Sequence, residues 1–364
     1  MSTSSRVSPT DLARLFDQFA RSEAQGASPL YFQLAQEVAK DEEILELASN
    51  TLRSQPPPNM LFGAVHFLLL RGITHPLSNF YSSLSDSPAP AADAYPHFRN
   101  FCLAHRNEIK ELLATRLVQT NEVSRCSSLL PAFAVVERLS DGHHWFMVDI
   151  GASAGLNLNW DRYSYDFGRS RWGPVESGLD LVCEVRRGNA VPLPSPALRI
   201  DSRVGIDINP LDLGEADDRL WLRALIWPEQ RERAVRLSKA IEIFQRNPVK
   251  LVRGEALEVL PNLLNNAPPG LAICLFSSFT LNQISVEVRD LLAAFLREFS
   301  HDGRKVFFLT LGGATLSGEA GQEIELWLNV FERGSIRKHR LALCAPHGGW
   351  VDWLGRDDSG GRPQ

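Results

Sequence analysis

The sequence predicts an α/β protein in which an all-α N-terminal domain precedes a mostly parallel sheet with helices on both faces. Two observations support this fold class. Apolar residues recur at helical spacing through the first 140 residues, and from residue 145 short apolar runs alternate with helical segments. Such alternation is typical of a parallel sheet covered on both faces. We expect a helical domain over 1–140, a sheet domain over 141–355 and a disordered tail over 356–364.

The N-terminal domain contains several segments with helical periodicity. Apolar positions at 12–19 and at 30–38 predict two amphipathic helices, and a longer one is expected at 98–113. Residues 60–70 are apolar on nearly every side, which predicts a buried helix. A polar segment at 119–126 then interrupts the apolar helices. We expect this domain to act as a lid that selects the substrate.

The second half of the chain is expected to alternate strands and helices around an insertion at about 160–200 that contains a hairpin near 181–185. The strands are predicted at 146–150, 203–208, 249–253, 271–276 and 305–311, followed by an antiparallel pair at 325–332 and 339–344. The helices between them are predicted at 217–246, just after 256, and at 286–299.

The turn after the first strand is the most informative stretch. The strand ends at Asp149, and glycines follow at Gly151 and Gly155, as in tight turns that bind a phosphate or a nucleoside. Glycines allow the backbone to turn sharply and to approach a ligand closely. Two further acids, Asp207 and Glu255, lie at or just after the next two strands. Ligands of open α/β sheets bind beyond the carboxyl ends of the strands, so we expect these acids at one binding edge.

These segments resemble the motifs of class I S-adenosylmethionine-dependent methyltransferases, which have a Rossmann-like fold. Residues 149–155 resemble the first motif, Asp-x-Gly-x-Gly-x-Gly, with Ser153 at the middle glycine, and residues 205–210 and 254–256 resemble the second and third. Asp149 and Asp207 are 58 positions apart, where roughly 20 are usual, and the insertion accounts for the difference. The resemblance implies S-adenosylmethionine as cofactor. Its implied cofactor-binding residues are Asp149, Gly151, Ser153, Gly155, Asp207, Glu255, Ala256 and Ser277.

The whole chain also resembles a bacterial family known as domain of unknown function 2332. The matching segments are 56–59, 119–122, 151–157, 207–210 and 346–348. That family brings no known activity, so this resemblance implies an architecture rather than a function.

Two alternative functions use the same residues. Residues 151–155 also read Gly-x-Ser-x-Gly, the nucleophile elbow of α/β-hydrolases, with Ser153 as nucleophile and His347 in the triad. That fold requires several strands before the elbow, whereas helices are expected here, and it leaves Asp149 without a role. The other alternative is a nucleotide-binding protein without catalytic activity.

The polar segment at 119–126 is a candidate wall of the substrate site. We expect Gln119, Asn121, Glu122 and Arg125 to lie opposite the glycine turn, with Asn157 also facing the substrate. The alternative is a simple helix start, with Asn121 as its cap and Glu122 in its first turn. The catalytic base is not identified by the sequence. The candidate catalytic residues are His347, Glu122 and Ser153.

The composition argues against several kinds of partner, metal site and cellular location. The net charge of −5 argues against a nucleic-acid partner, so a small-molecule substrate is expected, and the oligomeric state is not predicted. Five well-separated cysteines, with neither Cys-x-x-Cys nor His-Glu-x-x-His, argue against a metal site. The N-terminus lacks the apolar core of a signal peptide, and the longest apolar run is too short to span a bilayer. We therefore expect a cytoplasmic protein that does not bind membranes.

Overall fold

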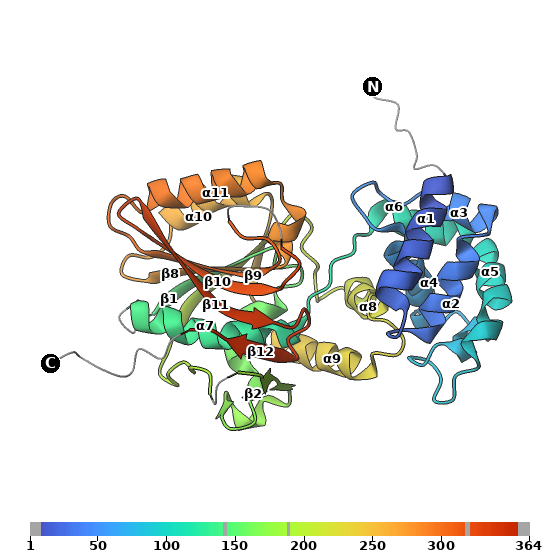
Figure 1. Cartoon of the computed structure of the whole chain (residues 1–364), viewed down its shortest axis with the longest axis horizontal. Helices are drawn as coiled ribbons and strands as arrows, with labels where there is room; N and C mark the ends of the chain where they lie inside the picture. The colour runs from blue at the N-terminus through green and yellow to red at the C-terminus, as the bar shows by residue number, and fades with distance from the viewer. Residues whose placement is uncertain (1–8, 141–143, 188–189, 317–320, 356–364) are drawn as a thin grey trace. The chain divides into compact units, whose positions relative to one another are not determined.

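The computed structural model describes residues 9–140, 144–187, 190–316 and 321–355, so the predicted tail at 356–364 lies outside the described residues. The chain forms two compact units (Figure 1). Unit 1 comprises Met1–Thr120 and Leu213–Ser238, and unit 2 comprises Asn121–Asp212 and Lys239–Gln364. The lid role expected of the helical domain stays a prediction.

The boundary between the units differs from the expected one at residue 140. Helix α7 (Cys126–Leu139) belongs to unit 2, because its Phe133 packs against Trp145, Trp160 and Phe276 of the sheet unit. Helix α8 (Ala216–Ala224), although it follows a strand of the sheet, belongs to unit 1, where Trp221 is part of the hydrophobic core. Local periodicity could not reveal either assignment, since both depend on long-range packing.

Unit 1 is helical, as predicted. Its further α-helices are α1 (Pro9–Phe19), α2 (Pro29–Val38), α3 (Glu42–Ala48), α4 (Pro57–Leu70), α5 (Ala94–Ala104) and α6 (Arg106–Thr115). Helix α4 is buried on nearly all sides, as its sequence predicts. The single helix expected at 98–113 is wrong, because the chain leaves helical geometry at His105, with φ −111° and ψ 30°.

Unit 2 is built on a nine-stranded sheet in the order β5-β12-β11-β10-β9-β8-β1-β6-β7. The strands are β1 (Trp145–Ile150), β5 (Glu184–Val185), β6 (Ile200–Asp207), β7 (Lys250–Arg253), β8 (Ala272–Ser278), β9 (Val306–Gly312), β10 (Glu325–Glu332), β11 (Ser335–Cys344) and β12 (Trp350–Trp353). The five strands from β7 to β9 are parallel, and β10 and β11 form the predicted antiparallel pair. The prediction of a mostly parallel sheet is therefore confirmed, whereas β12 was not predicted.

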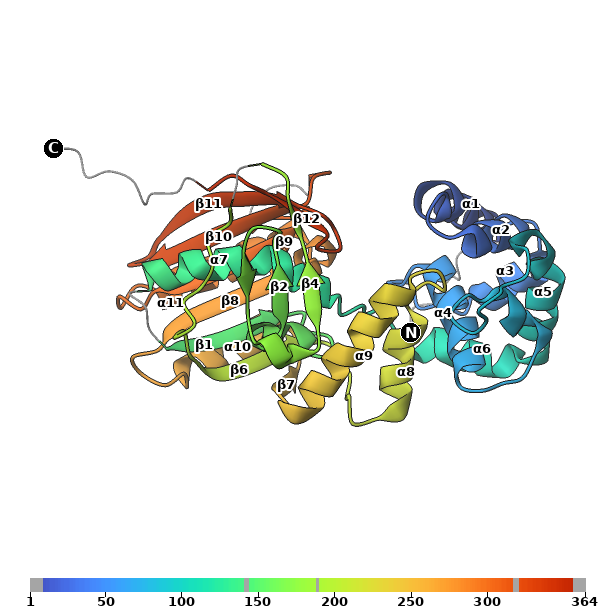
Figure 2. The same ribbon diagram turned by 90° about the horizontal axis from the view of Figure 1, so that it is seen from below.

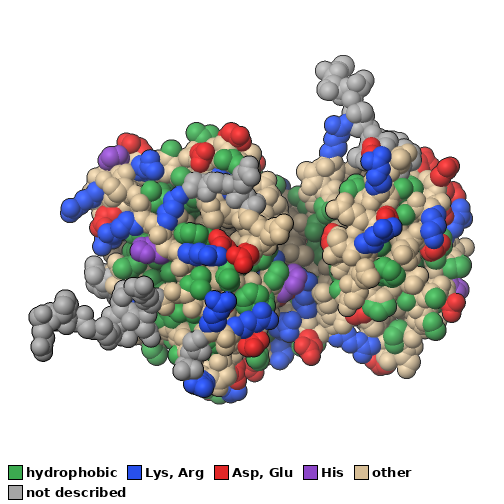
Figure 3. Space-filling model, viewed as in Figure 1, with side chains coloured by type: hydrophobic (Ala, Val, Ile, Leu, Met, Phe, Trp, Pro, Cys, Tyr) green, Lys and Arg blue, Asp and Glu red, His purple; other side chains and the backbone are tan. Residues whose placement is uncertain are grey.

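Helices cover both faces of this sheet. Helices α10 (Ala256–Asn265) and α11 (Val286–Phe299) lie on one face and α7 lies on the other (Figures 1 and 2). Side chains alternate along β1 and β8, so Val148 and Leu275 enter the core beneath α10 and α11, whereas Phe276 meets α7. No helix within the described ranges is long and apolar enough to cross a membrane. On the face seen in Figure 3, basic and acidic side chains are interspersed.

Two sequence-based expectations for the loops between strands are corrected. The insertion forms a small three-stranded sheet of β2 (Ser164–Asp166), β3 (Arg171–Trp172) and β4 (Asp180–Val182). The expected hairpin at 181–185 is absent from it, since β4 joins this small sheet while β5 pairs with β12 of the large one. The helix expected at 217–246 is divided into α8 and α9 (Arg231–Arg246), and the break contains Pro228, which cannot continue a helix.

The order of the strands places a reversal at β1. From β1 the chain adds β6 and β7 on one side and then crosses over to add β8 and β9 on the other. Ligand sites of open α/β sheets lie at such reversals, beyond the carboxyl ends of the strands. The strand order thus predicts a ligand site at the carboxyl ends of β1 and β8.

Candidate functional site

The turn after β1 has an unusual backbone. Gly151, Ser153 and Gly155 all have positive φ angles, of 82°, 53° and 76°. Such a conformation is uncommon for a residue other than glycine. At Ser153 it is stabilised by Asp207, whose Oδ2 accepts a hydrogen bond of 2.8 Å from the Ser153 backbone N–H. The end of β6 therefore holds the turn that follows β1.

Both glycines of this turn are required by packing within the protein. A Cβ atom added at Gly151 would lie 1.8 Å from Oγ1 of Thr280, and one added at Gly155 would lie 2.9 Å from side-chain atoms of Val249 and Leu251. We predicted that these glycines allow close approach of a ligand. In the structure the close approach is made by Thr280 at one position and by two apolar side chains at the other.

The three predicted acids do lie at the carboxyl ends of adjacent strands. Asp207 ends β6, and its Oδ1 accepts a second backbone hydrogen bond, of 2.8 Å, from Asn209 N–H. The backbone N–H of Gly254 donates to the carbonyl oxygen of Asp207, which places the next acid, Glu255, beside it. Glu255 is exposed at the start of α10, and Ala256 is the first residue of that helix.

Asp149 is the most distinctive of these acids. Its side chain is 2% exposed, and its Oδ1 has no hydrogen-bond partner among the residues that the structure describes. Burial raises the pKa of Asp149 well above its ordinary value, and the charge of nearby Asp207 raises it further. A buried carboxyl group with an unsatisfied oxygen costs free energy, so it is typical of functional sites.

Ser277 lies on the other face of the sheet from Asp149. Asp149 pairs with Phe276 in the β1–β8 register, so these two side chains share the α7 face, and the next residue, Ser277, points to the opposite one. The Ser277 hydroxyl is buried and makes no hydrogen bond with any described residue. The register therefore places the side chains of Ser277 and Asp149 on opposite faces of the sheet.

The polar segment reaches the glycine turn, as predicted. Asn121 Oδ1 accepts a hydrogen bond of 2.9 Å from the backbone N–H of Leu156, the first residue of the 3₁₀ helix η5 (Leu156–Arg162). Glu122 instead caps the short 3₁₀ helix η4 (Val123–Arg125), because its Oε1 accepts from Ser124 N–H at 3.1 Å. The alternative of one capped helix start is wrong in detail, since the two residues cap two different helices.

Arg125 lies at the end of β8. Its guanidinium carbon is 3.9 Å from the centre of the Phe279 ring, a distance suited to a cation–π interaction. Its Nε donates to the carbonyl oxygen of Pro346 at 3.0 Å. Arg125 is 8% exposed, so its charge is held in a largely buried position between the β8 end and the segment that contains Pro346.

The turn between β11 and β12 packs directly against the polar segment. A Cβ atom added at Gly348 would lie 1.9 Å from the carbonyl oxygen of Ser124, and the Ser127 hydroxyl lies 2.8 Å from the carbonyl oxygen of Gly348. Nδ1 of His347 is 4.0 Å from Oε2 of Glu122. Segments far apart in the sequence, around residues 122, 151 and 347, thus meet at one edge of unit 2.

The chain belongs to the family described as "Uncharacterized protein conserved in bacteria (DUF2332)", which it matches over residues 13–353. No curated protein matches the chain. The match covers both units and includes every segment of the site described above.

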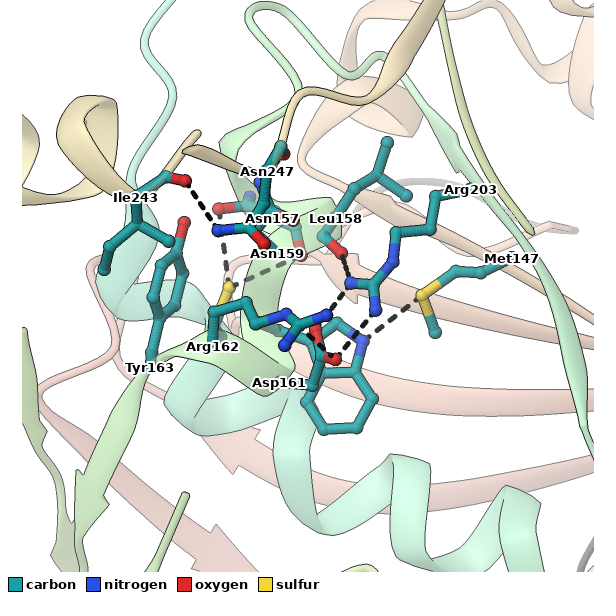
Figure 4. Close-up of polar contacts among 12 residues, drawn as sticks. Met147, Asn157, Leu158, Asn159, Asp161, Arg162, Tyr163, Arg203, Ile243 and Asn247 are labelled. Carbon is teal, nitrogen blue, oxygen red and sulfur yellow. Dashed lines mark hydrogen bonds and ion pairs between the residues drawn. The ribbon is translucent and has the colours of Figure 1, made fainter. Parts of the chain in front are cut away.

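Two predicted substrate-binding residues have other surroundings. Gln119 lies in unit 1, so the structure does not assign it to this site. Asn157 is 4% exposed, and its Oδ1 lies 3.5 Å from Sγ of Cys126, at the start of α7 (Figure 4). Asn157 therefore contacts the protein interior rather than an open surface.

Sequence reasoning missed the residues that fix η5 to the sheet. Arg203 of β6 donates hydrogen bonds to both carboxylate oxygens of Asp161 and to the carbonyl oxygen of Leu158 (Figure 4). Thr280, which covers Gly151, was also missed. Neither position has a local sequence signal, because each role depends on a partner that is distant in the chain.

Proposed function

We propose that unit 2 is a Rossmann-like domain that binds S-adenosylmethionine at the carboxyl edge of β1, β6 and β7 and transfers its methyl group to a small molecule. The strand order supports this proposal. Numbered by their appearance, the strands β7-β6-β1-β8-β9-β10 have the order 3-2-1-4-5-6 of doubly wound nucleotide-binding sheets, with β10 running antiparallel.

The observation that carries the proposal is the unsatisfied Oδ1 of Asp149 beside the glycine turn. S-adenosylmethionine carries an ammonium group and a sulfonium cation. A cationic group brought to Asp149 would provide the missing hydrogen bond and stabilise the ionised carboxylate, which burial disfavours. In the proposed complex Asp149 therefore holds the amino-acid portion of the cofactor.

We propose that Asp207 and Glu255 hold the ribose and the adenine of the cofactor. Asp207 accepts one backbone hydrogen bond on each oxygen. A carboxylate can accept about four hydrogen bonds, so contacts with the ribose hydroxyls are compatible with those already present. Glu255, exposed at the end of the next strand, is the candidate for the adenine amino group.

Calorimetric titration with S-adenosylmethionine, S-adenosylhomocysteine and NAD tests the proposal. We expect the first two to bind and Asp149→Asn to weaken S-adenosylmethionine binding by about 1–3 kcal/mol, or roughly 5- to 150-fold. Because the pKa of Asp149 is raised, binding should also release a proton, so the observed enthalpy should depend on the ionisation enthalpy of the buffer. Asp201→Asn, at the amino end of β6, is the matched control. Unchanged affinity in a folded Asp149→Asn protein would show that Asp149 does not bind the cofactor.

The hydrolase alternative shares one feature with the structure, the positive φ angle of Ser153. Against it, the Ser153 hydroxyl is buried and makes no hydrogen bond with a histidine or any other described residue, whereas a serine nucleophile needs a base within hydrogen-bond reach. A fluorophosphonate probe should therefore leave the protein unlabelled. Stoichiometric labelling that disappears in Ser153→Ala would favour the hydrolase.

A further inference from the structure

Glu122 is a buried carboxylate in a fixed orientation. The residue is 3% exposed, and its Oε1 accepts the hydrogen bond from Ser124 N–H that begins η4. That bond turns the other oxygen, Oε2, toward Nδ1 of His347 at 4.0 Å. One oxygen of Glu122 thus serves the backbone and the other faces an imidazole.

His347 is held by its neighbours while its own ring stays accessible. Arg125 binds the carbonyl oxygen of Pro346, and the Ser127 hydroxyl lies 2.8 Å from that of Gly348, so the backbone is fixed on both sides of His347. The His347 side chain is nevertheless 58% exposed. A mobile surface histidine would have neither of these backbone anchors.

The Glu122 carboxylate lies on the Nδ1 side of the His347 ring. An acceptor beside Nδ1 favours the Nδ1–H tautomer, and the lone pair then lies on Nε2, on the opposite edge of the ring. A distance of 4.0 Å exceeds that of a formed hydrogen bond, but contacts of this kind often tighten when a ligand binds. Once the ring is protonated, the Glu122 charge also stabilises it.

The pair lies next to the proposed cofactor site. The side-chain oxygen of Asn121, the residue before Glu122, accepts a hydrogen bond from the first N–H of the helix that leaves the glycine turn. We propose that Glu122 and His347 form a dyad in which His347 is the general base of methyl transfer. It acts on an acceptor that must lose a proton, either a neutral hydroxyl group or an ammonium group. This inference rests on the proposed function.

Methyl transfer in this proposal requires that the acceptor atom lose a proton. Nε2 of His347 takes the proton from the acceptor oxygen or nitrogen, and an electron pair of the deprotonated atom forms the new bond to the methyl carbon of the sulfonium. The bond between carbon and sulfur breaks, and its electron pair returns to sulfur, which gives S-adenosylhomocysteine. The imidazolium is stabilised by Glu122 until it loses the proton to solvent. The protein otherwise needs only to align the acceptor with the methyl group.

Nitrogen NMR of the full-length protein labelled at histidine tests the dyad. The chain has nine histidines, so the His347 signals are assigned by their loss in His347→Asn. We expect neutral His347 to be mainly the Nδ1–H tautomer in the native protein and mainly the Nε2–H tautomer in Glu122→Gln. Glutamine keeps an oxygen for Ser124 N–H, so a purely structural role of Glu122 would leave the His347 spectrum unchanged.

An unrelated histidine–carboxylate pair provides the matched control. Nδ1 of His144 lies 2.7 Å from Oδ2 of Asp201, and Asp201→Asn should change the His144 signals while leaving those of His347 as they are. A native His347 in the Nε2–H form, or one unaffected by Glu122→Gln, would overturn the dyad alone.

The cofactor experiment separates this outcome from failure of the proposed function. His347→Asn should bind S-adenosylmethionine with native affinity, because a base for the acceptor does not hold the cofactor. A loss as large as that expected for Asp149→Asn would make His347 a cofactor ligand and overturn its role as a base. If native protein binds no S-adenosylmethionine, the proposed function fails and the methyl-transfer role of the dyad fails with it, whatever the tautomer.

Discussion

Each end of the large sheet brings a carboxylate close to a histidine, and the two pairs differ in how deeply the carboxylate is buried. At the amino ends of β1 and β6, His144 and Asp201 form an ion pair at 2.7 Å, with side chains 55% and 40% exposed. At the carboxyl end, Glu122 beside His347 has a side chain only 2% exposed, and Asp149 is buried as well. Exposed pairs contribute little to stability because water screens them, whereas buried carboxylates carry a desolvation cost. The carboxyl end therefore buries acidic side chains at a cost in free energy, which is typical of a functional site.

The largest change in the free energy of unfolding is expected at a glycine of the carboxyl end, Gly151, and it is compared with Gly303 at the amino end of the sheet. Gly151→Ala adds a Cβ atom against Thr280 at a positive φ angle, and overpacking together with left-handed strain should lower the free energy of unfolding by about 2–5 kcal/mol. Gly303→Ala, before β9, has a positive φ angle of 92° but nothing within 4 Å of its added Cβ, so about 1–2 kcal/mol is expected. Urea unfolding measures both. Equal losses would mean that Thr280 does not confine the turn.

Removal of the carboxylate that holds the turn should have the next largest effect. Asp207→Ala deprives Ser153 N–H and Asn209 N–H of their acceptor, which should cost about 1–3 kcal/mol in unfolding free energy. Asp207→Asn retains one acceptor oxygen and should lose less. If the alanine variant is as stable as the native protein, Asp207 does not organise the turn.

The stability of Asp149→Asn should depend on pH differently from that of the native protein. The pKa of Asp149 is raised in the folded protein, so the protonated carboxyl group contributes to the free energy of unfolding. This contribution is full below the ordinary pKa of 3.8 and is lost as pH rises through the folded-state pKa. Asparagine does not titrate. The variant should therefore be more stable than the native protein at neutral pH, and its advantage should disappear near pH 3.8. Denaturant unfolding at several pH values gives the sign, and an advantage that grows as pH falls would contradict it.

The smallest effect is expected at the amino end. Asp201→Asn removes one partner of an exposed ion pair, which should change the unfolding free energy by at most about 1 kcal/mol and less in high salt. A larger loss, insensitive to salt, would show that the two ends differ less than their exposure indicates.

Local patterns predicted the elements of the fold because strand and helix periodicity is a property of neighbouring residues. The buried helix α4 and the antiparallel pair β10–β11 followed from such patterns. The break at His105 and the assignment of α8 to unit 1 did not, because tertiary packing decides them. The break around Pro228 had a sequence signal that was not used.

The site was predicted to a similar extent. The rule that parallel strands end at one edge placed Asp149, Asp207 and Glu255 correctly, and the position of Asn121 beside the glycine turn is confirmed. Glu122 and His347 were separate candidates, and only the turn between β11 and β12 joins them. Ser277 could not be placed without the register of β8, on which the choice of face depends.

The discontinuous make-up of unit 1 has a consequence for biosynthesis. Its core includes Trp221 and Leu225, and Trp221 packs against Phe67 of α4. On the ribosome these residues emerge about 100 residues after Thr120, a delay of about 5–20 s at ordinary rates of translation. During that interval β1 and β6 have already been made. The helical unit that begins the chain thus completes its core only after part of the sheet unit has been synthesised, and a fragment ending at Thr120 would leave the α4 surface beneath Trp221 uncovered.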